Sequence, residues 1–181
     1  GNVTAITESQ AKDVMFNAKY YANMNPDLKA AFGYDSNKLY NHYVTCGIKE
    51  GRSASPIFDP VYYLNNNPDL RNAFGNNYTA AYNHWIQYGC AEGRDSSKYY
   101  NGYYYRSRNL DLERAYFSSG DLGYSYYRLA RHYLEYGIGE RRWANSNGYI
   151  PTEIEISNGS SGNVGSGTYS ISGNILTVNG V

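Results

Sequence analysis

Hydrophobic and polar positions alternate with a helical period in the middle of the chain. Between Phe58 and Arg94, the residues Tyr78, Ala81, Tyr82, Trp85 and Ile86 follow the spacing i, i+3, i+4, i+7 and i+8, which places them on one face of a helix. The pairs Asp59-Pro60 and Asn67-Pro68 mark two earlier helix starts, because proline at the first helical position lacks an amide that would be unpaired there anyway. Gly75 and Gly89 are natural helix ends. This stretch therefore predicts three short helices.

The same pattern occurs on both sides of this stretch. The copy 42 positions earlier keeps the matching residues Tyr20, Tyr21, Asn25, Pro26, Asp27, Leu28, Ala31, Phe32, Gly33, His42, Gly47, Glu50, Gly51 and Arg52. A third copy starts at the same spacing, but its second half, from His132 to Arg142, lies 48 positions on, so six residues are inserted between Tyr116 and Arg131. A fixed period of this size indicates stacked supersecondary units.

We therefore predict a mainly α fold. Residues 1–149 form one domain of three stacked helical repeats of about 42 residues, each of three short helices, with repeats at 16–55, 58–97 and 99–145. Residues 1–6 are expected to be a loose lead-in. Thr7 and Gln10 match a capping box, which predicts a helix from Glu8 to Phe16 that caps the stack.

The character of the chain changes after Asn145. Residues 152–157 alternate as a half-buried strand does, and a Gly/Ser/Asn-rich loop over 158–167 follows. Residues 169–172 and 175–178 flank Gly173-Asn174, which predicts a hairpin. Residues 150–181 are thus a C-terminal β-hairpin or three-strand annex, or the start of a following domain, and the flexible loop favours the second reading.

Composition and charge exclude several classes of partner. Lys plus Arg and Asp plus Glu are both 16, so no net charge is available to hold a nucleic acid. No apolar run is long enough to insert in a membrane. The chain has 23 Tyr against five Phe and two Trp, a mixture that suits wet recognition surfaces and favours an extracellular binding protein. Cys46 and Cys90 are not at equivalent positions, and both a bridge between neighbouring repeats and two unpaired thiols are compatible with the sequence.

The pattern F-D-x-x-Y-Y-x-x-x-N-P-D-L, followed by H-[YW]-x-x-x-G-x-x-E-G-R, resembles short repeats of large secreted and surface proteins of bacteria, including those of gut Firmicutes. In such proteins they often stand beside adhesion or polysaccharide-degrading modules. The resemblance covers about Phe16 to Arg142 and implies an exported, non-catalytic module of a multidomain protein at the cell surface. The third copy departs from it, with Leu110 in place of Pro and Arg141 in place of Gly.

Residues that recur in every copy are expected to have structural roles. The three histidines His42, His84 and His132 share one repeat position, whereas an active site is normally single. We expect each imidazole to donate to a neighbouring carbonyl, and the recurring Arg to clamp a carboxylate or helix-end carbonyls of an adjacent unit. The recurring Asp at the helix starts is explained by capping, and no spacing suits a metal. We therefore expect no catalytic residue, metal or cofactor.

The aromatic residues outside the repeat register carry the functional prediction. They are Tyr99, Tyr100, Tyr103, Tyr124, Tyr126, Tyr127 and Trp143. An exposed ring accepts the apolar face of a pyranose, and Arg106 or Asp121, with Asn101 and Arg108 nearby, could bind its hydroxyls. These rings could equally close the apolar end of the final repeat.

The preferred hypothesis is a monomeric, extracellular module that binds a polysaccharide or glycan without catalysis. The alternatives are an adhesin that binds a host glycoprotein or immunoglobulin, and a passive spacer between neighbouring modules.

Overall fold

The computed structural model describes residues 4–151, 161–164, 167–172 and 175–179, with side chains for 4–151. The fold is mainly α, as predicted. Within the described part, no helix is long and apolar enough to cross a membrane.

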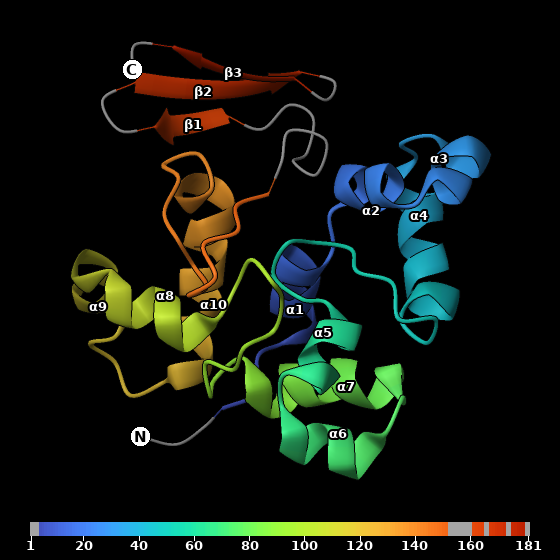
Figure 1. Cartoon of the computed structure of the whole chain (residues 1–181), viewed down its shortest axis with the longest axis horizontal. Coiled ribbons are helices and arrows are strands. Elements are labelled where there is room, and N and C mark those ends of the chain that lie inside the picture. The colour runs from blue at the N-terminus through green and yellow to red at the C-terminus, as the bar shows by residue number, and fades with distance from the viewer. Residues whose placement is uncertain (1–3, 152–160, 165–166, 173–174, 180–181) are drawn as a thin grey trace.

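Most helices fall into three groups of three along the chain (Figure 1). The first helical group is α2 (Ala18–Met24), α3 (Pro26–Phe32) and α4 (Ser36–His42), continued by the π-helical turn η1 (Tyr43–Gly47). The second is α5 (Pro60–Asn65), α6 (Pro68–Phe74) and α7 (Tyr78–His84), continued by η2 (Trp85–Gly89). The third is α8 (Gly102–Arg108), α9 (Leu110–Tyr116) and α10 (Leu122–His132), continued by η3 (Tyr133–Gly137).

Local sequence signals set the starts of these helices. Asn17, Asp59 and Asn101 cap α2, α5 and α8 by accepting backbone amides through their side chains. Helix α10 has 11 residues against seven in α4 and α7, and Asp121 caps its start. The insertion of the third copy therefore lengthens this helix by four residues, since 11 − 7 = 4.

The last helix of each group ends in a π-helical turn rather than in the regular helix that the periodicity predicts. In the second group, a Cβ added at Gly89 would lie 2.1 Å from the Tyr63 Oη. The same holds for Gly47 against Tyr21 and for Gly137 against Tyr105, at 2.0 and 2.1 Å. Glycine is required at the end of the turn because a buried tyrosine hydroxyl occupies the space of a side chain.

Residues 4–15 are central, and the prediction that residues 4–6 belong to a loose lead-in and that the following helix caps the stack is wrong. Helix α1 (Glu8–Met15) begins with the predicted capping box. It lies between the three helical groups in Figure 1. Ala11, Val14 and Met15 are buried in the hydrophobic cluster of the second and third groups, and the Ile6 amide donates to the Ile86 carbonyl at 3.1 Å. The apolar face of α1 therefore fills the space between groups instead of covering one end.

The C-terminal strands form an antiparallel sheet in the order β1-β2-β3. Its strands are β1 (Ser161–Val164), β2 (Gly167–Ser172) and β3 (Ile175–Asn179), with Tyr169 paired to Val178 and Gly162 to Tyr169. Strand β1 lies within the stretch predicted as a loop, so that part of the prediction is wrong. The strand predicted at 152–157 and the turn at 173–174 lie outside the described residues.

Candidate functional site

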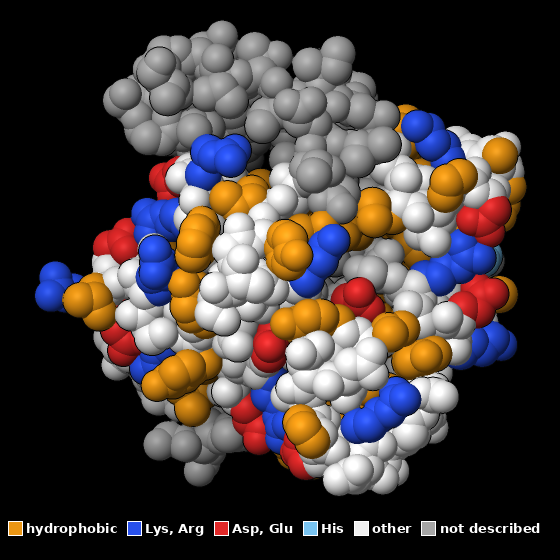
Figure 2. Space-filling model, viewed as in Figure 1, with side chains coloured by type: hydrophobic (Ala, Val, Ile, Leu, Met, Phe, Trp, Pro, Cys, Tyr) orange, Lys and Arg blue, Asp and Glu red, His pale blue; other side chains and the backbone are white. Residues whose placement is uncertain are grey.

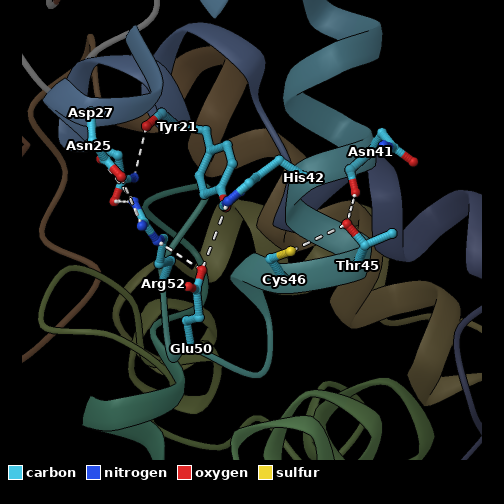
Figure 3. A network of polar contacts seen from close by, with 9 residues as sticks. All are labelled: Tyr21, Asn25, Asp27, Asn41, His42, Thr45, Cys46, Glu50 and Arg52. Atoms are coloured by element: carbon cyan, nitrogen blue, oxygen red, sulfur yellow. Dashed lines mark hydrogen bonds and ion pairs between the residues drawn. The ribbon is translucent and has the colours of Figure 1, made fainter. Parts of the chain in front are cut away.

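Each helical group contains one polar network, shown for the first group in Figure 3. The Tyr21 hydroxyl lies 2.8 Å from the Nδ1 atom of His42. Arg52 binds both carboxylate oxygens of Asp27 at 2.9 Å and donates from Nε to Glu50 at 3.2 Å. Charge-assisted hydrogen bonds thereby join helix α3 to the chain that follows η1.

The other two groups repeat this arrangement. The second uses Tyr63, His84, Asp69, Glu92 and Arg94, and the third uses Tyr105, His132, Asp111, Glu140 and Arg142. The expectation that each histidine pairs with a carbonyl is wrong, because its partner is a tyrosine hydroxyl of the same group. The arginine clamps a carboxylate, as expected, but within its own group rather than in an adjacent unit.

Burial and neighbouring charges shift the pKa values of the side chains in these networks. Burial raises the pKa of the Tyr63 hydroxyl far above its ordinary value, so this hydroxyl keeps its proton in its hydrogen bond with Nδ1 of His84. Burial, with Arg94 nearby, lowers the pKa of His84. Burial, with Arg142 nearby, lowers the pKa of His132 in the same way. The hydrogen bonds from Arg94 lower the pKa of Asp69. These side chains hold the helical group together, because their hydrogen-bond partners lie within the same group.

Two of the predicted binding residues are buried. Tyr99 is 5% exposed and Tyr100 is 2% exposed, and both belong to the hydrophobic cluster of the second and third groups. The Tyr100 ring packs 5.5 Å from that of Tyr133. Their assignment as ligand-binding residues is wrong, because both rings are buried between the second and third groups, next to the buried Ser97.

Arg106 and Asp121 are committed to structural contacts. Arg106 forms an ion pair with Glu113, and its guanidinium lies 3.9 Å from the centre of the Phe117 ring. Asp121 accepts the Tyr124 amide at 3.0 Å as the cap of α10. Both residues therefore stabilise the inserted segment, and their predicted role in binding hydroxyls is not needed to explain them.

The remaining predicted residues reach the surface at separate places. Tyr103 is 65% exposed on α8 and Trp143 is 43% exposed after η3. The guanidinium of Arg108 lies 5.2 Å from the centre of the Trp143 ring. Among the contacts of the described residues, neither ring touches Tyr124 or Tyr127, so the predicted set does not form one patch.

Tyr124 and Tyr127 form an aromatic pair on α10. Their ring centroids lie 6.2 Å apart with 30° between the planes, so the two rings are nearly parallel. Tyr124 is 46% exposed, Tyr127 is half-buried, and the Arg128 guanidinium lies 5.6 Å from the centre of the Tyr124 ring. Two nearly parallel rings, one of them open to solvent, are a platform for a flat apolar surface.

A polar cleft of about 640 Å³ lies beside this pair, between α1, α10 and the first helical group. We call it the α1–α10 cleft. Asp13 lines the cleft and accepts two hydrogen bonds, one from the Tyr127 hydroxyl and one, at 2.9 Å, from Nη1 of Arg131. Its other polar side chains are Ser9, Lys12, Asn17 and Ser36. Its lining thus joins the rings of Phe16 and Tyr127 to hydroxyl, carboxylate, guanidinium and amide groups.

The cleft exists because the groups pack differently at this junction. Where the first group meets the second, a Cβ at Gly51 would lie 2.9 Å from the Tyr78 ring, and where the second meets the third, one at Gly93 would lie 2.7 Å from the Tyr126 Oη. The position equivalent to Tyr78 in the first group is Ser36, which leaves space.

Asp13, Lys12 and Arg131 were missed by sequence reasoning. They come from segments more than a hundred positions apart, and no local pattern joins them. One signal was available, since Ser36 breaks a register that otherwise carries tyrosine.

The side chains that the structure describes offer no metal site beside this cleft. Among the side chains of residues 4–151, no group of three His, Cys, Asp or Glu residues could hold a metal ion. Cys46 and Cys90 are free thiols, so the bridge considered from the sequence is not formed, and burial strongly raises the pKa of Cys90. On the face shown in Figure 2, basic and acidic side chains are interspersed with separate hydrophobic ones.

Comparisons of the chain with protein-family models, curated proteins and solved structures find no match. A functional assignment therefore depends on the chemistry of the cleft.

Proposed function

We propose that this chain is a non-catalytic glycan-binding module of an exported bacterial multidomain protein, built from three copies of one helical repeat. The binding site is the α1–α10 cleft together with the Tyr124–Tyr127 pair. The observation that carries the proposal is the position of this nearly parallel ring pair at the edge of a polar cleft.

The chemistry of the two parts is complementary. A pyranose presents an apolar face of C–H groups and a rim of hydroxyls, so it needs a ring on one side and polar groups beside it. Tyr124 supplies the exposed ring, while Asp13 and Arg131 supply a carboxylate and a guanidinium that can bind neighbouring hydroxyls. Because Asp13 and Arg131 already pair with each other, the cleft is held in shape before a sugar arrives.

The test is retention on native gels that contain soluble polysaccharides. We expect Tyr124→Ala to weaken retention about tenfold, which corresponds to about 1.4 kcal/mol. Tyr127→Phe keeps the ring but removes the hydroxyl that binds Asp13, so we expect a smaller loss. Tyr103→Ala is the matched control, because Tyr103 is more exposed than Tyr124 but does not pack against Tyr127, the ring that lines the cleft.

The outcomes separate the three functional hypotheses. Unchanged retention of the Tyr124→Ala variant by a polysaccharide that retards the wild type would refute the site. Absence of retention by every polysaccharide, with a protein captured from serum or mucus, would favour an adhesin. A chain that binds neither sugar nor protein would be a spacer.

A further inference from the structure

The π-helical turns of the second and third groups are each covered by an extended piece of the chain. Over η2, residues 4–6 run between the turn and helix α10. The Ile6 amide donates to the Ile86 carbonyl at 3.1 Å, and a Cβ at Gly123 would lie 2.2 Å from the Thr4 carbonyl oxygen. Ile6 is only 4% exposed. Turn η3 is contacted by strand β1.

The turn of the first group has no such cover in the described part of the chain. Val44, which lies 42 positions before Ile86, is 43% exposed. A cavity of about 480 Å³ lies beside it, between η1 and α7. This cavity thus lies between the turn of one group and the last helix of the next group. Residues 4–6 occupy the corresponding space between η2 and α10.

The lining of this cavity suits an aliphatic side chain with a polar backbone. Tyr40, Val44 and Ile48 form one wall, and Tyr82 and Ile86 contribute to the other. The rim is polar, with Glu8 and Lys49 among its residues. A segment laid there in the manner of residues 4–6 would place one amide against the Val44 carbonyl and one side chain between Tyr40 and Tyr82.

We propose that the η1–α7 cavity binds an extended peptide segment of a partner protein through an aliphatic side chain and a backbone hydrogen bond to Val44. The occupant is inferred from the chain's own segment on the equivalent turn. Main-chain hydrogen bonds would supply affinity and the single apolar pocket would supply selectivity, as in other modes of extended-peptide recognition. This surface is separate from the α1–α10 cleft, so either proposal can fail alone.

The probe is a blocked hexapeptide with the sequence of residues 3–8, Val-Thr-Ala-Ile-Thr-Glu, titrated into the isotope-labelled full chain. We expect saturable shifts of the Val44, Thr79 and Asn83 amide signals, with a Kd on the order of 1 mM. Val44→Lys is expected to weaken binding at least tenfold, and Asp in place of the peptide's Ile to abolish it. Leu110→Lys is the matched control, since Leu110 is 61% exposed and lies outside the cavity.

Three results would overturn the proposal. The first is no shift at several millimolar peptide. The second is shifts at Gly123 and Ile86 without Val44, which would mean that the peptide only replaces the chain's own segment. The third is a dimer that forms with concentration and is lost in Val44→Lys, which would reassign the cavity to a second copy of this chain.

Discussion

At the scale of single residues, the guanidinium groups at the end of each helical group bear the most polar contacts. Arg94 donates to both oxygens of Asp69 at 2.8 Å, to Glu92 at 3.1 Å and to Asn67 at 3.3 Å. Its side chain is 21% exposed while that of Asp69 is 61% exposed, so water screens one side of the pair. Asn67 is buried, so no water would replace the hydrogen bond that its side-chain oxygen accepts from Arg94.

We therefore expect Arg94→Ala to lower the free energy of unfolding at pH 7 by about 1–2 kcal/mol. Urea unfolding measures the change. The pKa of Asp69 is lowered from its ordinary value of 3.8 by Arg94, so protonation breaks the Arg94–Asp69 ion pair only at acidic pH. The difference in unfolding free energy between the variant and the wild type should therefore shrink as the pH falls below 3.8. Arg71→Ala is the control, since Arg71 is exposed on α6 and forms no ion pair among the described side chains. An equal loss in both variants would contradict a specific clamp.

The histidines give the scaffold a pH dependence with a defined sign. The pKa values of His84 and His132 lie below 6.5 in the folded chain, so between those values and 6.5 the unfolded chain binds more protons. Their contribution to stability is complete above pH 6.5 and is lost as the pH falls below it. We expect urea midpoints to decrease from pH 7.5 to pH 5.5, and to decrease less in a His84→Asn, His132→Asn double variant, whose amides can still meet the tyrosine hydroxyls. Equal pH slopes would show that other groups cause the change.

At the scale of elements, glycine positions decide how neighbouring helical groups meet. Gly93 has φ +66° and its missing side chain makes room for Tyr126, whereas Gly75 has φ +61° and nothing within 4 Å. Both positions strain an L side chain, but only Gly93 lies in a junction. In the third group the equivalent residue is Arg141, with φ +58° and an exposed side chain. A non-glycine residue is tolerated there because no further helical group packs against it.

This pair of glycines allows backbone strain to be separated from packing. We expect Gly75→Ala to destabilise the chain by about 1–3 kcal/mol from backbone strain alone, because an L residue rarely adopts φ +61° with ψ −117°. Gly93→Ala should cost about 1–3 kcal/mol more, because the added methyl overpacks the Tyr126 contact. Thermal unfolding of the two variants measures the difference. Equal losses would mean that the junction yields without cost.

Local sequence signals predicted where helices begin better than they predicted which distant residues those helices contact. Capping residues and prolines placed the helix starts, because these interactions act within one turn of the chain. The π-helical turns were missed, since they depend on a tyrosine hydroxyl that comes from an earlier helix. The burial of Tyr99 and Tyr100 was missed for a related reason, because departure from the repeat register does not distinguish a surface ring from one that fills a junction. Of the predicted binding residues, Tyr103, Tyr124 and Trp143 have exposed rings, and a role for them in binding stays a prediction.

At the scale of the whole molecule, α1 connects parts that are distant in sequence. Its buried face joins the cluster of the second and third helical groups, and its polar face forms a wall of the α1–α10 cleft. Lys12, which also lines the cleft, places its ammonium 4.0 Å from the centre of the Tyr40 ring of the first group. The proposed site therefore requires that α1 be in place, so stability of the centre and binding at the cleft should be coupled.

The two methionines of the chain offer a matched test of this central role. Met15 on α1 is 1% exposed, whereas Met24 on α2 is 41% exposed. We expect Met15→Ala to lower the free energy of unfolding by about 2–5 kcal/mol, and Met24→Ala to change it by less than about 0.5 kcal/mol. Trp85, buried in the second group, reports the transition by fluorescence, and circular dichroism reports the helices of all groups.

If α1 holds the groups together, both signals should shift to lower urea together in Met15→Ala, because the hydrophobic cluster that it enters spans two groups. Fluorescence and dichroism transitions that separate in the wild type would instead mean that the groups unfold independently and that α1 belongs to only one of them. Glycan retention of Met15→Ala, measured below its transition, should then match the wild type, since the variant lowers stability without altering any side chain that lines the cleft.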